Sequence, residues 1–185
     1  MRNPRWISWG MLAIWSALML TVQLVLVYRV HPGSASKYIL MPDLTIALAV
    51  ALAVRVPRTG ILPVVLVMAI VRIAFSTDPP AAILAAFLAV SLLVGGLRKG
   101  IDVGGVVPRT VIAFLCATGM SVWGQWVMHA RNRSLAWSNS GGGDLSQLLS
   151  ASMAPALVTC ALVGMFGVLL ARLPGLSPLY KRPKI

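Results

Sequence analysis

The sequence has few charged residues and almost no acids. Only 11% of its 185 residues are charged, glutamate is absent, and four aspartates supply every side-chain carboxylate. A soluble domain carries about 25% charged residues, because its surface must face water. This chain has too little polar sequence for such a surface. We therefore predict that a lipid bilayer surrounds it.

The residues on which most enzyme sites depend are also scarce. The chain has two histidines and two cysteines, and neither cysteine has a histidine or a carboxylate at metal-ligand spacing. It contains no Gly-Lys-Ser/Thr phosphate loop, no Gly-x-Ser-x-Gly, no His-Glu-x-x-His and no paired carboxylates. We predict that the protein is not an enzyme and has no catalytic residue, cofactor or metal site.

Long apolar runs make up most of the chain. Continuous Leu-, Ala- and Val-rich segments favour transmembrane helices over the alternating strands of a barrel. We predict one all-α integral membrane domain over 1–185, built as a bundle of six transmembrane helices. Their expected ranges are 6–28, 39–54, 61–76, 81–97, 106–128 and 145–173, followed by a basic tail over 174–185.

The segments 39–54, 61–76 and 81–97 are shorter than the roughly 20 residues that cross a bilayer comfortably. A five-helix alternative therefore stays open, with 39–54 lying in the membrane interface. The tail is too polar and too rich in proline for another span. We expect it to lie along anionic lipid headgroups.

The basic residues indicate how the bundle is oriented. With six helices, eleven of the sixteen Lys and Arg residues fall on the side of the two termini and four fall on the opposite side. Because cytoplasmic loops carry the excess of positive charge, we predict that both termini are cytoplasmic. The net charge is +12, but the basic residues are scattered at segment ends, which argues against a nucleic-acid partner.

Arg72 is the one ionisable residue that the sequence places at membrane depth. It lies eleven residues beyond Ile61, about 16 Å along the helix. Its side chain either reaches the outer interface near Asp78 or anchors another subunit or a polar group of the bundle. We favour the first interpretation.

Three further polar residues are candidates for contact with a partner. Asp43 follows Pro42 where the second segment begins, and an acid there opposes the positive end of a helix. We interpret it as a cap, with contact to an extracytoplasmic partner as the alternative. Asp78 lies in the proline-rich link that forces segments three and four into a hairpin. Gln125 ends a stripe of small residues in the fifth segment and is placed to donate a hydrogen bond across that seam.

Small residues recur every four positions in most segments. Such stripes let helix backbones approach closely in a membrane. We expect them to be packing faces within the bundle, with the alternative that one serves a partner helix. Two examples are Ala81, Ala85 and Ala89 in the fourth segment, and Ala113, Ala117 and Ser121 in the fifth.

Several of these features together resemble the bacterial rod shape-determining protein MreD family. The resemblance covers most of the chain, from the second segment to the sixth. In the second segment, residues 42–44 open a helix that ends at 55–58, and the hairpin 76–80 follows the third. The sequence 96–99 closes the fourth helix, and the last helix contains Pro155 and ends at Arg172. One position departs from the family, because MreD proteins often carry an acid late in the third helix where this chain has Arg72.

The resemblance implies a non-enzymatic subunit of the cell-wall elongation machinery in the bacterial inner membrane, which supports peptidoglycan synthesis and cell shape. Its implied partner is MreC, a membrane-anchored coiled-coil protein. The MreB filament and a SEDS glycosyltransferase with its transpeptidase belong to the same assembly. The family fold is similar to the substrate-binding subunits of energy-coupling-factor vitamin transporters. Such a vitamin-capture subunit is the alternative function, and it would need an outer pocket built from Trp123, Gln125 and Trp126.

Overall fold

The computed structural model describes residues 5–30, 42–100, 105–135 and 145–180, and within these ranges all regular structure is helical. The helices are α1 (Arg5–Val30), α2 (Leu44–Ala53), α3 (Arg58–Phe75), α4 (Pro80–Gly100), α5 (Val106–Leu135), α6 (Leu145–Ala171) and α7 (Ser177–Tyr180). This confirms the all-α class. Five of the helices, α1 and α3 to α6, are long and apolar enough to cross a membrane. They indicate a multi-pass membrane protein.

Helix α2 differs from its predicted form. The sequence predicts a span over 39–54, but the helix begins at Leu44 and has only ten residues. Ten residues rise about 15 Å, half of the roughly 30 Å hydrocarbon core. Nine of the ten are buried, and α2 contacts all five long helices. It is therefore a half-length helix inside the bundle, neither a full span nor an interfacial helix.

The sequence of α2 explains why it is enclosed. From Ile46 to Ala53 larger aliphatic side chains alternate with alanine, and apart from Thr45 the helix has no polar side chain. A helix that is apolar all round packs with neighbours on every side. The alanines bring the surrounding helices close, while side chains such as Ile46, Leu48 and Leu52 fill the space between them and have no exposed surface.

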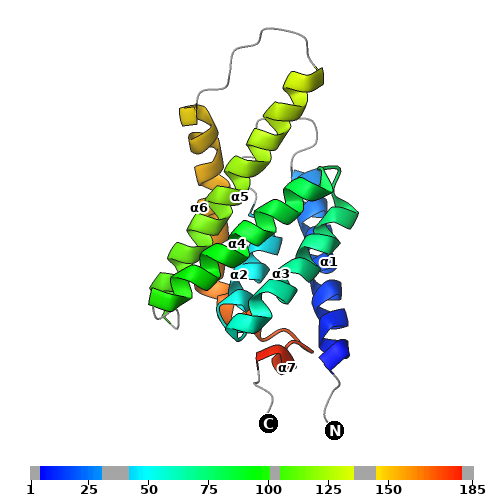
Figure 1. Ribbon diagram of the computed structural model, residues 1–185, viewed down its shortest axis with the longest axis vertical. Coiled ribbons are helices and arrows are strands. Elements are labelled where there is room, and N and C mark those ends of the chain that lie inside the picture. Colours follow the sequence, from blue (N-terminus) through cyan, green and yellow to red (C-terminus); the bar gives the residue numbers. More distant parts are fainter. Residues whose placement is uncertain (1–4, 31–41, 101–104, 136–144, 181–185) are drawn as a thin grey trace.

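The other helices form a ring around α2 (Figure 1). Helices α5 and α6 pack against each other most extensively, and α3 and α4 form the expected antiparallel hairpin. The first turn of α1 and the short helix α7 lie at the same end of the bundle, at the bottom of Figure 1. We call this the tail end, and the opposite end the far end.

The segment after α6 folds back against the bundle. Trp15 Nε1 of α1 donates a hydrogen bond to the carbonyl oxygen of Pro174 at 3.1 Å. Gly175 has φ +84° and lies so close to Met11 that a Cβ atom would sit 2.7 Å from the Met11 Cγ. A residue with a side chain would be strained here on both counts. The first part of the tail packs against the bundle and buries Leu176 and Leu179. Its expected place along lipid headgroups stays a prediction.

One tail residue has a shifted acidity. Burial raises the pKa of the Tyr180 hydroxyl to about 12, although the nearby Arg55 guanidinium acts in the opposite direction.

Positive side chains gather at the tail end of the described bundle, where α2, α4 and α6 finish and α3 and α5 begin. They are Arg55, Arg58, Arg98, Lys99, Arg109 and Arg172.

Candidate functional site

The start of α2 is held by polar groups from two other helices. The first N–H groups of any helix lack partners within it, and in a membrane interior each one must find another acceptor. Asp43 Oδ1 accepts from the Ile46 N–H at 3.0 Å, which confirms the predicted cap. The Asp43 N–H donates to Thr159 Oγ1 of α6 at 2.9 Å, and the Leu44 N–H donates to Gln23 Oε1 of α1 at 3.3 Å.

Thr159 is available for this role because of its own position. It lies four residues after Pro155 in α6, and its hydroxyl donates to the Pro155 carbonyl oxygen at 2.8 Å. Having donated its hydrogen, the hydroxyl oxygen is left to accept from Asp43. Thr159 is fully buried, twelve residues before the end of α6 at Ala171. That distance is about 18 Å along the helix, so the start of α2 lies well inside the bundle.

Arg72 pairs with Asp43. Its Nη1 donates to Asp43 Oδ2 at 2.6 Å, and the two side chains are 24% and 22% exposed. The guanidinium carbon also lies 6.0 Å from the centre of the Phe87 ring. The interpretation favoured by the sequence, a side chain reaching the interface, is therefore not what the structure has. Arg72 instead bonds to a polar group of the bundle, which was the alternative.

Asp78 contributes to the same region from the α3–α4 hairpin. Its carboxylate accepts from Ser76 Oγ, and its own N–H donates to the same oxygen, both at 3.1 Å. These bonds fix the turn between the two helices. The negative charge of Asp78 adds a weaker attraction to the Arg72 guanidinium. Asp43, Arg72 and Asp78, three of the four candidate residues, thus lie in one neighbourhood.

Gln125, the fourth candidate, lies apart from this cluster. Its side chain is half-buried on α5 and makes no hydrogen bond within the part of the chain that the structure describes. The flanking Trp123 and Trp126 are exposed and stacked, with ring centroids 5.3 Å apart. Trp123 also donates to the Ala82 carbonyl oxygen at 2.9 Å.

Trp123 borders two spaces of different size. With Arg72 and Asp78 it lines a cavity of about 40 Å³. It also lines a space of about 320 Å³ between α4 and α5, whereas Gln125 and Trp126 line neither of the two. Sites for small organic ligands have volumes of about 300–1,000 Å³, so only the larger space has a suitable volume, and the vitamin-capture alternative stays a prediction.

The end of α2 is capped by a different charged residue. Arg98, near the end of α4, donates from Nη1 to the carbonyl oxygens of Ala53 and Val56 at 2.8 and 2.6 Å. The end of a helix carries partial negative charge, which a guanidinium complements. Arg58 Nη2 donates in turn to the carbonyl oxygen of Arg98 at 2.6 Å. From the sequence, Arg98 was used only as one of the basic residues that indicate orientation, and its role as a cap was not predicted.

An apolar groove runs between α4 and α5. These two helices touch less closely than α3 touches α4 or α5 touches α6. The groove encloses about 320 Å³, and its lining includes Ala85, Ala89 and Leu93 of α4 and Leu115 and Gly119 of α5. The predicted alanine stripe of α4 was expected to pack within the bundle, but its members Ala81, Ala85 and Ala89 are all exposed.

These polar residues are suited to holding α2 in place. Within the described ranges, no three His, Cys, Asp or Glu side chains come together as metal ligands would. The positive end of a broken membrane helix is where transporters of several folds bind the anionic group of a substrate. Here Asp43 supplies that negative charge from the chain itself, and Arg72 balances it. Comparisons of the chain with family models, curated proteins and solved structures gave no match.

Proposed function

We propose that this protein is a non-enzymatic subunit of the bacterial cell-wall elongation machinery, as the resemblance to MreD implies. It binds the transmembrane helix of a membrane-anchored partner of the MreC type and so supports peptidoglycan synthesis and rod shape. Through that partner it joins the MreB filament and the SEDS glycosyltransferase with its transpeptidase. It resides in the bacterial inner membrane with both termini in the cytoplasm.

The observation that carries the proposal is the α4–α5 groove. Small side chains at Ala85, Ala89 and Gly119 leave the backbones of two neighbouring helices open to the outside. In a membrane, helices associate where such residues permit close packing, because lipid gives no hydrophobic driving force for association. A partner helix in this groove would cover the small residues that the bundle itself leaves bare.

The polar interior supports a structural role. Asp43, Arg72 and Arg98, the charged side chains that contact α2, all bond to its ends or to one another. Each bond replaces one that water would otherwise make to a helix end. A bundle built in this way can present a fixed outer surface to a partner without performing chemistry.

The groove can be tested by filling it at Gly119. A Cβ atom at Gly119 would meet no atom within 4 Å, so Gly119→Leu fits the folded protein while its side chain projects into the groove. We expect this variant to lose most of its recovery of MreC from the same genome, at matched membrane levels. The measurement is co-purification of tagged partner, with cell shape as the second readout.

The matched control is Gly10→Leu on α1. Gly10 is also exposed, and a Cβ atom at this position would likewise meet no atom within 4 Å, but Gly10 lies outside the groove. The variant should retain the partner and normal cell shape. Undiminished recovery with Gly119→Leu would contradict the assigned groove, and loss only with Gly10→Leu would move the interface to α1.

The orientation has its own test. Fusion of a reporter that is active only in the periplasm should give no activity at Ile185 and full activity within 138–143, because most of the basic residues fall on the side of the termini. Activity at Ile185 would overturn the proposed cytoplasmic termini.

A further inference from the structure

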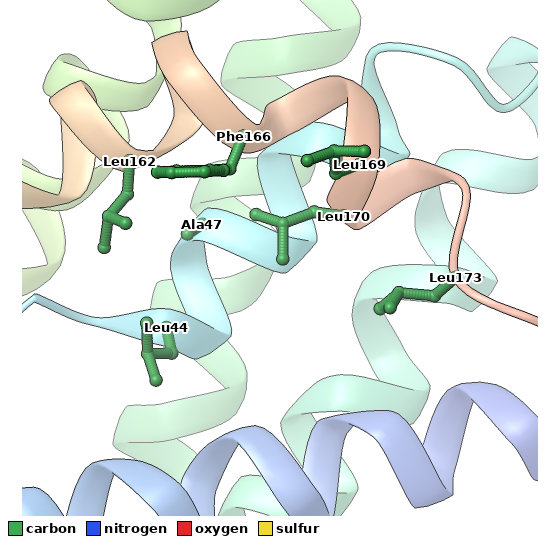
Figure 2. A pocket seen from close by; sticks show the side chains of 7 residues that line it. All are labelled: Leu44, Ala47, Leu162, Phe166, Leu169, Leu170 and Leu173. Carbon is green, nitrogen blue, oxygen red and sulfur yellow. The ribbon is translucent and has the colours of Figure 1, made fainter.

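A second apolar opening lies on another face of the bundle and reaches the central helix. Figure 2 shows it between α6 and α2, lined by Leu162, Phe166, Leu169 and Leu170 of α6, by Leu173 just after α6, and by Leu44 and Ala47 of α2. It encloses about 260 Å³. We call it the Leu44 cleft. Of the ten residues of α2, only Leu44 is not fully buried, so the cleft is where the outside meets α2.

The cleft is bounded by contacts that α1 makes. At one end the Leu44 N–H donates to Gln23 Oε1, and at the other Trp15 Nε1 donates to the Pro174 carbonyl oxygen. Trp15 and Gln23 are eight residues apart on α1, about 12 Å. Leu162 lies nine residues before the end of α6 at Ala171, about 14 Å, and Leu173 follows that end by two residues. Both lengths correspond to half of the hydrocarbon core of a bilayer.

The lining differs in kind from that of the α4–α5 groove. The Leu44 cleft has one small residue in its lining, Ala47, among leucines and Phe166. The α4–α5 groove has four, Ala85, Ala86, Ala89 and Gly119, among its larger side chains. Helix pairs in membranes favour small residues at their contacts. A spanning helix also needs about 30 Å of length. The Leu44 cleft is about half as long, because the tail segment crosses to α1 and closes it there. The cleft therefore suits a single flexible hydrocarbon chain better than a helix.

The charges near the cleft indicate which lipid would supply that chain. The cleft ends at Leu173, next to the exposed Arg172, at the end of the bundle where the basic side chains gather. Of the two aspartates that the structure describes, Asp43 lies beside Leu44, at the opposite end of the cleft from Arg172, and Asp78 lies in the α3–α4 hairpin. Basic residues at a membrane surface attract anionic headgroups.

We propose that the Leu44 cleft binds one acyl chain of an anionic phospholipid from the leaflet at the tail end. The chain lies along α6 from Leu173 to Leu162 and contacts Leu44 of α2. Its headgroup lies beside Arg172. The bound chain fills the opening between α1 and α6 and completes the enclosure of α2.

The proposal can be tested with phosphatidylglycerol that carries a photoreactive diazirine on its acyl chain. The full-length protein is reconstituted in vesicles containing this lipid, irradiated, and mapped by mass spectrometry. Leu92 and Met165, which are 75% and 74% exposed, report labelling by surrounding lipid. We expect an additional adduct on Leu44 or Ala47. Labelling of Leu92 and Met165 with an unlabelled α2 would overturn the proposal.

Filling the cleft gives a second, independent result. Leu162→Trp enlarges a lining residue and should remove the adduct on α2, while Met165→Trp, on an exposed face of the same helix, should leave it unchanged. Leu170→Phe is a milder substitution that tests the same point if Leu162→Trp does not insert stably. An α2 adduct that persists in the filled variants would contradict the assigned cleft.

The headgroup is tested by competition with the zwitterionic form of the same lipid. Arg172→Gln should reduce the preference of the α2 adduct for the anionic lipid about fivefold, as expected for one basic residue at a membrane surface. Lys99→Gln, an exposed change at the same end of the bundle, should leave the preference unchanged. Equal loss in both variants would show that general surface charge, not a headgroup beside Arg172, sets the preference.

Discussion

The two ends of α2 have the same requirement and satisfy it differently. Each end leaves backbone groups without partners inside the helix. At the start, the Asp43 carboxylate caps the helix and is itself paired with Arg72. At the finish, one Nη1 atom of Arg98 bonds two carbonyl oxygens. The capping charge at the start is therefore paired with an opposite charge. The capping charge at the finish bonds to backbone carbonyl oxygens.

The position of each end explains this difference. The start of α2 lies next to Thr159, well inside the bundle, where an unpaired carboxylate would be costly. The finish lies at the tail end of the bundle, among other basic side chains, where a guanidinium keeps partial access to water. The two ends differ in burial as well as in polarity, and we attribute the counter-charge at the start to its position inside the bundle.

The largest effect is expected from removing the counter-charge at the deep end. Arg72→Leu leaves the Asp43 carboxylate unpaired in the bundle, and breaking a buried pair in this way costs about 3–5 kcal/mol. A side chain that merely reached the interface would tolerate the same change. Unfolding of the purified protein in mixed micelles measures the difference. Stability equal to that of the original protein would contradict the paired role of Arg72.

Removing the cap at the shallow end should have a smaller effect. Arg98→Leu deletes two hydrogen bonds from a charged donor, to the carbonyl oxygens of Ala53 at the end of α2 and of Val56 just after it, and such a bond contributes about 1.5–3 kcal/mol. We expect a loss within that range rather than the sum, since water can reach this end. Lys99→Leu is the control, because Lys99 is the exposed neighbour on the same turn. If Arg98→Leu proved as damaging as Arg72→Leu, the assigned difference in depth would be wrong.

The smallest effect is expected at the hydroxyl that supports the deep end. Thr159→Val keeps the side-chain shape but removes the acceptor of the Asp43 N–H, for an expected loss of about 1 kcal/mol. Thr21→Val makes the same chemical change where the hydroxyl bonds only to Ala17 within α1. The same unfolding assay should therefore separate the two variants. Equal losses would show that the hydrogen bond between helices contributes nothing of its own.

Local patterns in the sequence predict the helices and one of the two caps. The apolar runs predict six membrane-spanning helices, and in the described residues five are long and apolar enough to cross a membrane. Pro42 followed by Asp43 predicts a helix start that the structure confirms. The expected helix over 39–54 is longer than α2, because the apolar residues before Pro42 and Asp43 were included in it. Residues 39–41 lie outside the part of the chain that the structure describes.

Contacts between helices could not be predicted in this way. Arg72 and Asp43 are 29 residues apart, and Arg98 and Ala53 are 45 apart, so both contacts depend on how the helices pack. The stripe of Ala81, Ala85 and Ala89 looks the same in sequence whether it faces a neighbour or the outside. Only the arrangement of α4 beside α5 shows that these alanines are uncovered.

The central claim is that Asp43 and Arg72 act together to cap α2, and exchanging their charges tests it most directly. Asp43→Arg with Arg72→Asp preserves an ion pair but places a cation at the positive end of the helix and removes the acceptor for the Ile46 N–H. The reference is the neutral pair Asp43→Asn with Arg72→Gln, in which the amide oxygen can still cap the helix. The free energy of unfolding should be clearly lower for the exchanged pair than for the neutral pair. An exchanged pair as stable as the original protein would show that the two residues serve as an ion pair alone, and would contradict the claim.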